Sequence, residues 1–124
     1  MKKSLLPLVA IGCLFAAAAA RADDPVKVDP KHYKVEFENE SVRVLRIHYG
    51  PGEKSVMHDH PEAVAIYLTD AETKMTLADG KSTASAAKAG TVMQTPAGAH
   101  LPENTGKTGL DLILVELKGK TATK

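Results

Sequence analysis

Residues 52–62 read GEKSVMHDHPE, and they place two histidines, His58 and His60, one residue apart. Successive side chains on a strand alternate between its two faces, so both imidazoles point to the same side. Imidazole nitrogens held side by side suit a borderline divalent metal, and a third ligand from elsewhere in the fold would close the site. The same residues could instead form a polar turn before a strand, so a second segment is needed to decide.

Residues 90–104 read GTVMQTPAGAHLPEN and supply His100 as the candidate third ligand. Together, the two segments resemble the two sequence motifs of the small single-domain cupins (cupin type 2). The first motif is a glycine, five residues and a His-x-His pair. The second is a glycine, five residues, a Pro-x-Gly turn, a histidine and an asparagine. The matching residues are Gly52, His58, His60, Gly90, Pro96, Gly98, His100 and Asn104.

The resemblance implies an all-β jelly-roll barrel (a double-stranded β-helix) with a metal near its mouth. Two departures bear on the ligands: the motif's glutamate falls at Val64 or Ala65, and PAGAH is one residue shorter than the motif expects before its histidine. Three histidines still make a catalytic-type centre with open positions. The shorter spacing could alternatively turn His100 out of the barrel. Glu62, beside Pro61, is expected at a solvent-facing turn.

Strand alternation gives a prediction for the pocket around the histidines. If His58 and His60 face inward, Val56 should do so too. On the following strand, the apolar residues Val64, Ile66 and Leu68 should face the same interior. The mouth of the pocket could be lined by Met57, Met93, Gln94 and Asn104. His32 and His48 are expected at the surface or supporting the ligands.

Short apolar or alternating runs bounded by glycine and proline predict about nine strands and no long helix. The hairpin signal is strongest at Asp79-Gly80. The barrel domain is predicted over residues 32–118, after an extended arm over 23–31 and before a frayed tail over 119–124. The predicted strands cover residues 33–38, 42–49, 55–60, 63–68, 73–78, 81–86, 91–95 and 110–117.

The first 22 residues read as a cleaved signal peptide, so a periplasmic or secreted protein is expected. A basic start is followed by an apolar run and by Ala20-Arg21-Ala22, a small-x-small cleavage site. The run is shorter than the roughly 20 residues of a membrane-spanning helix, so no stable anchor is expected. Cys13, the only cysteine, lies inside this segment; lipidation at Cys13 is the alternative.

Charge gives no indication of nucleic-acid binding. The chain has 16 Lys and Arg against 15 Asp and Glu, and cleavage would remove Lys2, Lys3 and Arg21 and leave a net charge of about −2. The remaining basic residues are scattered rather than clustered, which is typical of a solvated surface.

Two functions fit these residues. One is a metal-dependent, oxygenase-type enzyme acting on a small chelating substrate, with iron(II) favoured over nickel, manganese or zinc. The other is a non-catalytic metal-binding or small-ligand-binding and sensing module. Three neutral ligands predict that metal is lost below about pH 6, and that Val64→Glu tightens metal retention. The resemblance also suggests a homodimer, and no catalytic residue beyond the metal is indicated.

Overall fold

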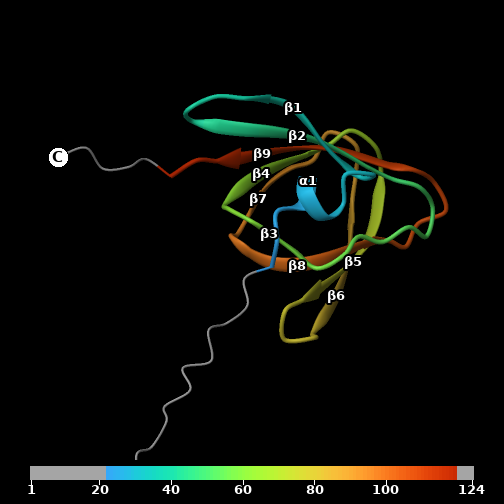
Figure 1. Ribbon diagram of the computed structural model, residues 1–124. Coiled ribbons are helices and arrows are strands. Elements are labelled where there is room, and N and C mark those ends of the chain that lie inside the picture. The colour runs from blue at the N-terminus through green and yellow to red at the C-terminus, as the bar shows by residue number, and fades with distance from the viewer. Residues whose placement is uncertain (1–21, 120–124) are drawn as a thin grey trace, which may run out of the picture.

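The computed structural model describes residues 22–119, which form one short helix and nine strands. The predicted all-β jelly roll is confirmed (Figure 1). The elements are α1 Pro25–Val28, β1 Tyr33–Glu38, β2 Val42–Tyr49, β3 His58–His60, β4 Ala63–Tyr67, β5 Ala71–Leu77, β6 Ser82–Ala87, β7 Val92–Thr95, β8 Gly98–Asn104 and β9 Leu110–Leu117.

The strands form two antiparallel sheets that face each other. The larger has the order β1-β2-β9-β4-β7, and the smaller has the order β3-β8-β5-β6. The β5–β6 hairpin turns at Asp79-Gly80 as predicted, with Gly80 at φ +85°, a conformation that favours glycine. In Figure 1 the β1–β2 hairpin extends beyond the barrel on one side and β6 on another.

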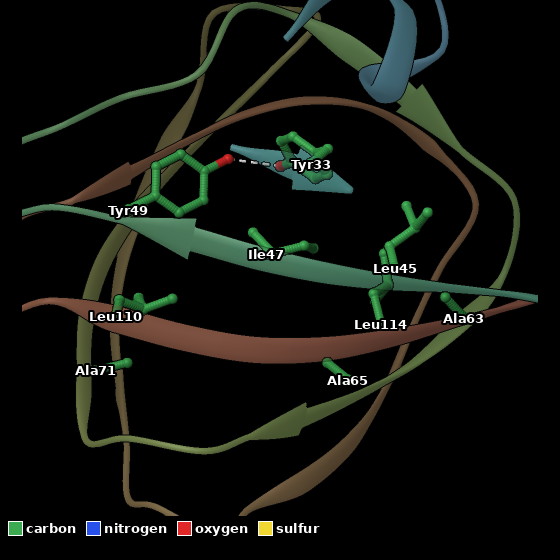
Figure 2. Close-up of a cluster of buried hydrophobic side chains, with 9 residues drawn as sticks. All are labelled: Tyr33, Leu45, Ile47, Tyr49, Ala63, Ala65, Ala71, Leu110 and Leu114. Carbon is green, nitrogen blue, oxygen red and sulfur yellow. Dashed lines mark hydrogen bonds between the residues drawn. The ribbon is translucent and has the colours of Figure 1, made fainter. Parts of the chain in front are cut away.

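The apolar core lies on the inner face of the five-stranded sheet (Figure 2). In β2, the side chains alternate from residue 45 on, because Leu45, Ile47 and Tyr49 are buried while Arg46 and His48 are exposed. In β9, Leu110 and Leu114 are buried on the same side. β9 lies between β2 and β4, which explains its nearly continuous apolar sequence.

The segment before β1 is not the extended arm that the sequence predicts. Asp24 accepts a hydrogen bond from the Val26 amide at 2.9 Å, and Pro25 fits the first turn, so α1 forms one helical turn. Pro25 and Asp29 are buried, and in Figure 1 α1 lies between the two sheets. The Asp59 amide also donates to the Asp23 carbonyl at 3.0 Å. This segment is therefore packed against the barrel beside β3.

The interior side chains of β4 differ from the prediction by one residue. Ala63 and Ala65 are buried, whereas Val64 and Ile66 are only partly buried and Leu68 is exposed. Pro61 and Glu62 form a bend between β3 and β4, and an odd shift in a strand exchanges its faces. Val56 is also exposed, because β3 begins only at His58.

The strand that carries His100 is not among the predicted strands, since Gly98 and Pro102 weaken its sequence signal. β8 nevertheless runs from Gly98 to Asn104 between β3 and β5. Gly98 has φ +142°, which L side chains rarely adopt, and it turns the chain from Pro96-Ala97 into the strand.

Two predictions fall outside the described residues. The signal peptide lies there except for Ala22, and so does the tail except for Gly119. Within residues 22–119, no helix has both the length and the hydropathy needed to cross a membrane.

Candidate metal centre

The three predicted ligands meet at one end of the barrel interior. His58 pairs with His100 across the β3–β8 ladder, and His60 lies two residues along β3 on the same face. One ring nitrogen from each lies within 4.8 Å of the others. His58 and His60 are buried, and His100 is partly buried. The shortened PAGAH spacing therefore does not turn His100 away.

Hydrogen bonds fix the ring orientation of two of these histidines. The His58 Nδ1 lies 2.8 Å from the Val56 carbonyl oxygen, which can only accept, so Nδ1 donates. The His60 Nδ1 donates to a Glu116 carboxylate oxygen at 2.6 Å. Both rings therefore carry their proton on Nδ1 when neutral and present an unprotonated Nε2 to the interior. The described residues form no hydrogen bond with the His100 ring.

The two Nε2 atoms of His58 and His60 lie 3.1 Å apart. Two lone pairs at this separation repel each other unless a proton or a cation lies between them. The separation also lets both nitrogens contact one ion at the roughly 2.0–2.1 Å of zinc–imidazole bonds. The donor set and its protonation thus fit a divalent metal.

The electrostatics keep two of the three histidines neutral. Burial, and then the neighbouring His60, lowers the pKa of His58 to about 4. Burial, followed by the proximity of His58 and His60, lowers the pKa of His100 to about 3. These values lie below the pH 6 at which unperturbed histidines were expected to lose a metal. The expected loss therefore moves to a lower pH.

A chain of charged groups supports His60 from the five-stranded sheet. Glu116 is 2% exposed and receives two hydrogen bonds from Arg43, at 2.5 and 3.1 Å, besides the one from His60. Arg43 also binds Asp24, the cap of α1, at 2.6 Å. Burial raises the pKa of the Glu116 carboxyl, but the bonds from His60 and Arg43 outweigh it, and the net shift is downward. Glu116 therefore stays ionised.

A second network supports His58. Ser55 donates to Asp29 at 2.6 Å, and its hydroxyl oxygen lies 3.2 Å from His58 Nδ1. Asp29 also contacts Nδ1 of His32 at 2.8 Å, and the other ring nitrogen of His32 faces Glu53 at 3.0 Å. His32 is thus a buried residue, linked to His58 through Asp29 and Ser55, rather than a surface residue.

Two tyrosines complete the surroundings. The Tyr33 hydroxyl lies 3.1 Å from His58 Nε2 and 2.6 Å from the Tyr49 hydroxyl, the pair joined in Figure 2. Beside them lies a cavity of about 70 Å³, bounded also by His60, His100 and Ala65. Its wall is mostly apolar, so it admits only a small molecule or a few waters.

The remaining predicted site residues do not reach the ligands. Glu62 is exposed and hydrogen-bonds Gln94, as expected of a solvent-facing turn. His48 is exposed and bonds Asp111. Asn104 is buried, but it caps backbone groups of the loops at the other end of the cavity. Met93 is exposed and Met57 is partly buried.

Val64 is turned to the outer face, so it is not the position where a glutamate would meet the metal. Ala65 faces the cavity instead. Five residues around the histidines were not predicted as part of the site: Tyr33, Tyr49, Ser55, Asp29 and Glu116. Of these, Glu116 had a detectable signal, because it is a charged residue at an inward position of the apolar strand β9.

Comparison with known proteins links this fold to solved structures. A cupin domain from Bordetella pertussis has a TM-score of 0.65 at 25% identity, over 70% of this chain and 92% of that one. An uncharacterized protein with a double-stranded β-helix domain from Klebsiella pneumoniae has a TM-score of 0.57 at 22% identity, over 73% and 78%. A cupin family protein from Methanocaldococcus jannaschii has a TM-score of 0.54 at 22% identity, over 72% and 83%. No protein-family model and no curated protein matches the sequence.

Proposed function

We propose that this protein, a small cupin, holds one divalent metal ion on His58, His60 and His100. The observation that carries the proposal is the pair of unprotonated Nε2 atoms 3.1 Å apart, whose Nδ1 atoms already donate to Val56 and Glu116. Structural cores rarely bury two acceptors face to face, and within the described residues only the Nε2 of His58 has a donor, the Tyr33 hydroxyl.

The all-imidazole donor set suits iron(II), nickel or zinc, and manganese to a lesser degree. When bound, the metal would supply a Lewis acid with positions open to a chelating ligand. The protein's own contribution is to orient the rings through Glu116 and Val56 and to exclude bulk water. We propose iron(II), and a substrate small enough to reach the cavity of about 70 Å³.

An oxygenase-type enzyme is the first form of this proposal. The small, mostly apolar cavity favours it, because such a space can admit a small apolar co-substrate such as dioxygen beside the ligands. A non-catalytic binding or sensing module is the second form. It is favoured because the described residues give the cavity no free carboxylate base. The only carboxylate among them that lines it, that of Glu103, pairs with Lys74 at 3.4 Å.

We also propose that the protein is exported and acts in the periplasm or outside the cell. The support is the sequence of residues 1–22. Mass spectrometry of the protein from its own host should give Asp23 as the first residue. An intact Met1, or lipid on Cys13, would contradict this.

Elemental analysis of the purified protein tests metal binding. The wild-type chain should carry one divalent ion per molecule, and His58→Ala should carry almost none. His48→Ala is the matched control, since the His48 ring is exposed and hydrogen-bonds Asp111 away from the three histidines. Equal metal content in all three proteins would refute the proposed site.

Oxygen consumption separates the two forms. The iron(II)-loaded protein is mixed with small chelators that carry two adjacent oxygen donors, and oxygen uptake is recorded with an electrode. Uptake that needs both chelator and His58 supports the enzyme. Chelator binding by calorimetry without uptake supports the binding module.

A further inference from the structure

The three histidines lack the carboxylate that the cupin motif would add. Ala65 occupies the inward position, and Glu62 is bonded to Gln94 outside the barrel. Glu116 is engaged by Arg43 and by Nδ1 of His60, on the side of that ring away from its converging Nε2. Within residues 22–119, no carboxylate joins the three-histidine group.

One oxygen atom does lie against one of the converging nitrogens, the Nε2 of His58. The Tyr33 hydroxyl is 3.1 Å from His58 Nε2, the same separation as between the Nε2 atoms of His58 and His60. The Tyr33 ring also lies beside that of His60, with centroids 5.7 Å apart. Tyr33 is 2% exposed, and its hydroxyl comes from β1 in the opposite sheet.

The hydrogen-bond directions around Tyr33 follow from the tautomer of His58. Because His58 carries its proton on Nδ1, its Nε2 accepts, and the Tyr33 hydroxyl must donate to it. The Tyr49 hydroxyl, 2.6 Å away, then donates to the Tyr33 oxygen. The phenolic proton of Tyr33 therefore lies between its oxygen and the Nε2 of His58.

A cation placed against His58 Nε2 would meet the Tyr33 proton first. Either the tyrosine moves away or its proton is displaced. Movement is restricted, because Tyr33 is packed among Leu45, Ile47 and Tyr49 in the core (Figure 2). Displacement leaves a phenolate oxygen that still receives the hydrogen bond from Tyr49.

We propose that Tyr33 is a fourth, oxygen-donor ligand of the metal, in the role that the cupin motif gives to glutamate. The inference rests on the proposed metal site. On metal binding, the Tyr33 O–H bond breaks, the metal–oxygen bond forms, and the proton passes to water. No electron is transferred. The phenolate offsets one of the two positive charges, and Tyr49 is a positioning residue that stabilises it.

Copper(II) is a suitable probe, since imidazole and oxygen donors bind it tightly and phenolate gives it a charge-transfer colour. The metal-free protein is loaded with one equivalent of copper(II) and dialysed. Copper content is measured together with the visible spectrum and the resonance Raman spectrum. The three tyrosines of the chain permit a complete set of variants: Tyr33→Phe, Tyr49→Phe and Tyr67→Phe.

The wild-type protein should retain one copper and show both the phenolate band and tyrosine ring modes in the Raman spectrum. Tyr33→Phe should retain copper on the three histidines but lose the band. Tyr49→Phe should keep the band, shifted to lower energy, because the phenolate loses its hydrogen-bond donor. Tyr67→Phe, which alters the cavity wall only, should match wild type.

Copper retained by the wild-type protein without a phenolate band would overturn the role of Tyr33, as would a band that survives in Tyr33→Phe. Because the wild-type Raman spectrum is itself decisive, a Tyr33→Phe variant that fails to fold does not block the test. If the wild-type protein retains no more copper than His58→Ala, the metal site itself is refuted.

Discussion

The five-stranded and four-stranded sheets bury different kinds of side chain. All the residues of the apolar core except Ala71 come from β1, β2, β4 and β9 of the larger sheet. All three histidines come from β3 and β8 of the smaller one. Its outer strand β6 is almost fully exposed. The apolar core is thus concentrated on the larger sheet and the three histidines on the smaller one, so a substitution in each should affect mainly stability or mainly the proposed metal binding.

The largest expected effect is on stability, from the larger sheet. Leu45→Ala removes a side chain that is 0% exposed and should lower the free energy of unfolding by about 2–5 kcal/mol. Urea denaturation of the metal-free protein measures this. Leu77→Ala in β5, where Leu77 is 47% exposed, is the control and should cost less than about 1 kcal/mol. Equal losses of unfolding free energy in the two variants would contradict the assignment of the stabilising core to the larger sheet.

The histidines of the smaller sheet should make the stability of the protein depend on pH. His58 and His100 have pKa values lowered to about 4 and about 3, whereas unfolded histidine has about 6.5. Between these values the unfolded chain binds protons that the folded chain does not, so stability falls as pH falls. We expect a loss of about 2 kcal/mol or more between pH 6.5 and pH 5 in the metal-free protein.

Chemical denaturation at several pH values checks this loss. His100→Ala should reduce the slope by about half, because one of the two protonating groups is gone. A slope unchanged by this substitution would mean that other groups produce it.

A smaller effect is expected where the sheets meet, at Glu116. Glu116→Gln keeps the shape but removes the charge that holds His60 and Arg43, and metal affinity should fall about 10- to 100-fold. Competition with a chromophoric chelator measures it. Glu62→Gln, whose carboxyl is exposed and bonded to Gln94, should match wild type.

The smallest effect is expected at Val64. Its side chain lies on the outer face of the larger sheet, so Val64→Glu should leave metal affinity within about threefold of wild type. The same chelator competition tests it. A clear tightening would show that position 64 reaches the metal after all, and would restore the prediction from the motif spacing.

Eight of the nine strands and the convergence of His58, His60 and His100 could be predicted, because they depend on local patterns: alternation, the Asp79-Gly80 turn and the spacing of the histidines. The prediction failed where the alternation of inward and outward side chains was continued past a bend. At Pro61 and Glu62 the chain turns, and Ala63 and Ala65 take the inward places expected for Val64 and Ile66.

The surroundings of the ligands were not predictable from local patterns, for a different reason. Tyr33 lies 25 residues from His58 in the sequence and Glu116 lies 56 from His60, so only the pairing of whole sheets brings them together. Alternation could place the Tyr33 and Tyr49 rings inside. It could not show that the Tyr33 hydroxyl meets His58 or that the Tyr49 hydroxyl meets Tyr33.

The unequal tethering of the three rings has a kinetic consequence. His58 and His60 are each held by a hydrogen bond at Nδ1, whereas the described residues hold the His100 ring by none. A ring without a tether can rotate off the ion first and rejoin it last. Metal exchange at the proposed site should therefore begin with the loss of His100, and an acceptor introduced within reach of the outward-facing ring nitrogen of His100 should slow release more than it changes the equilibrium affinity.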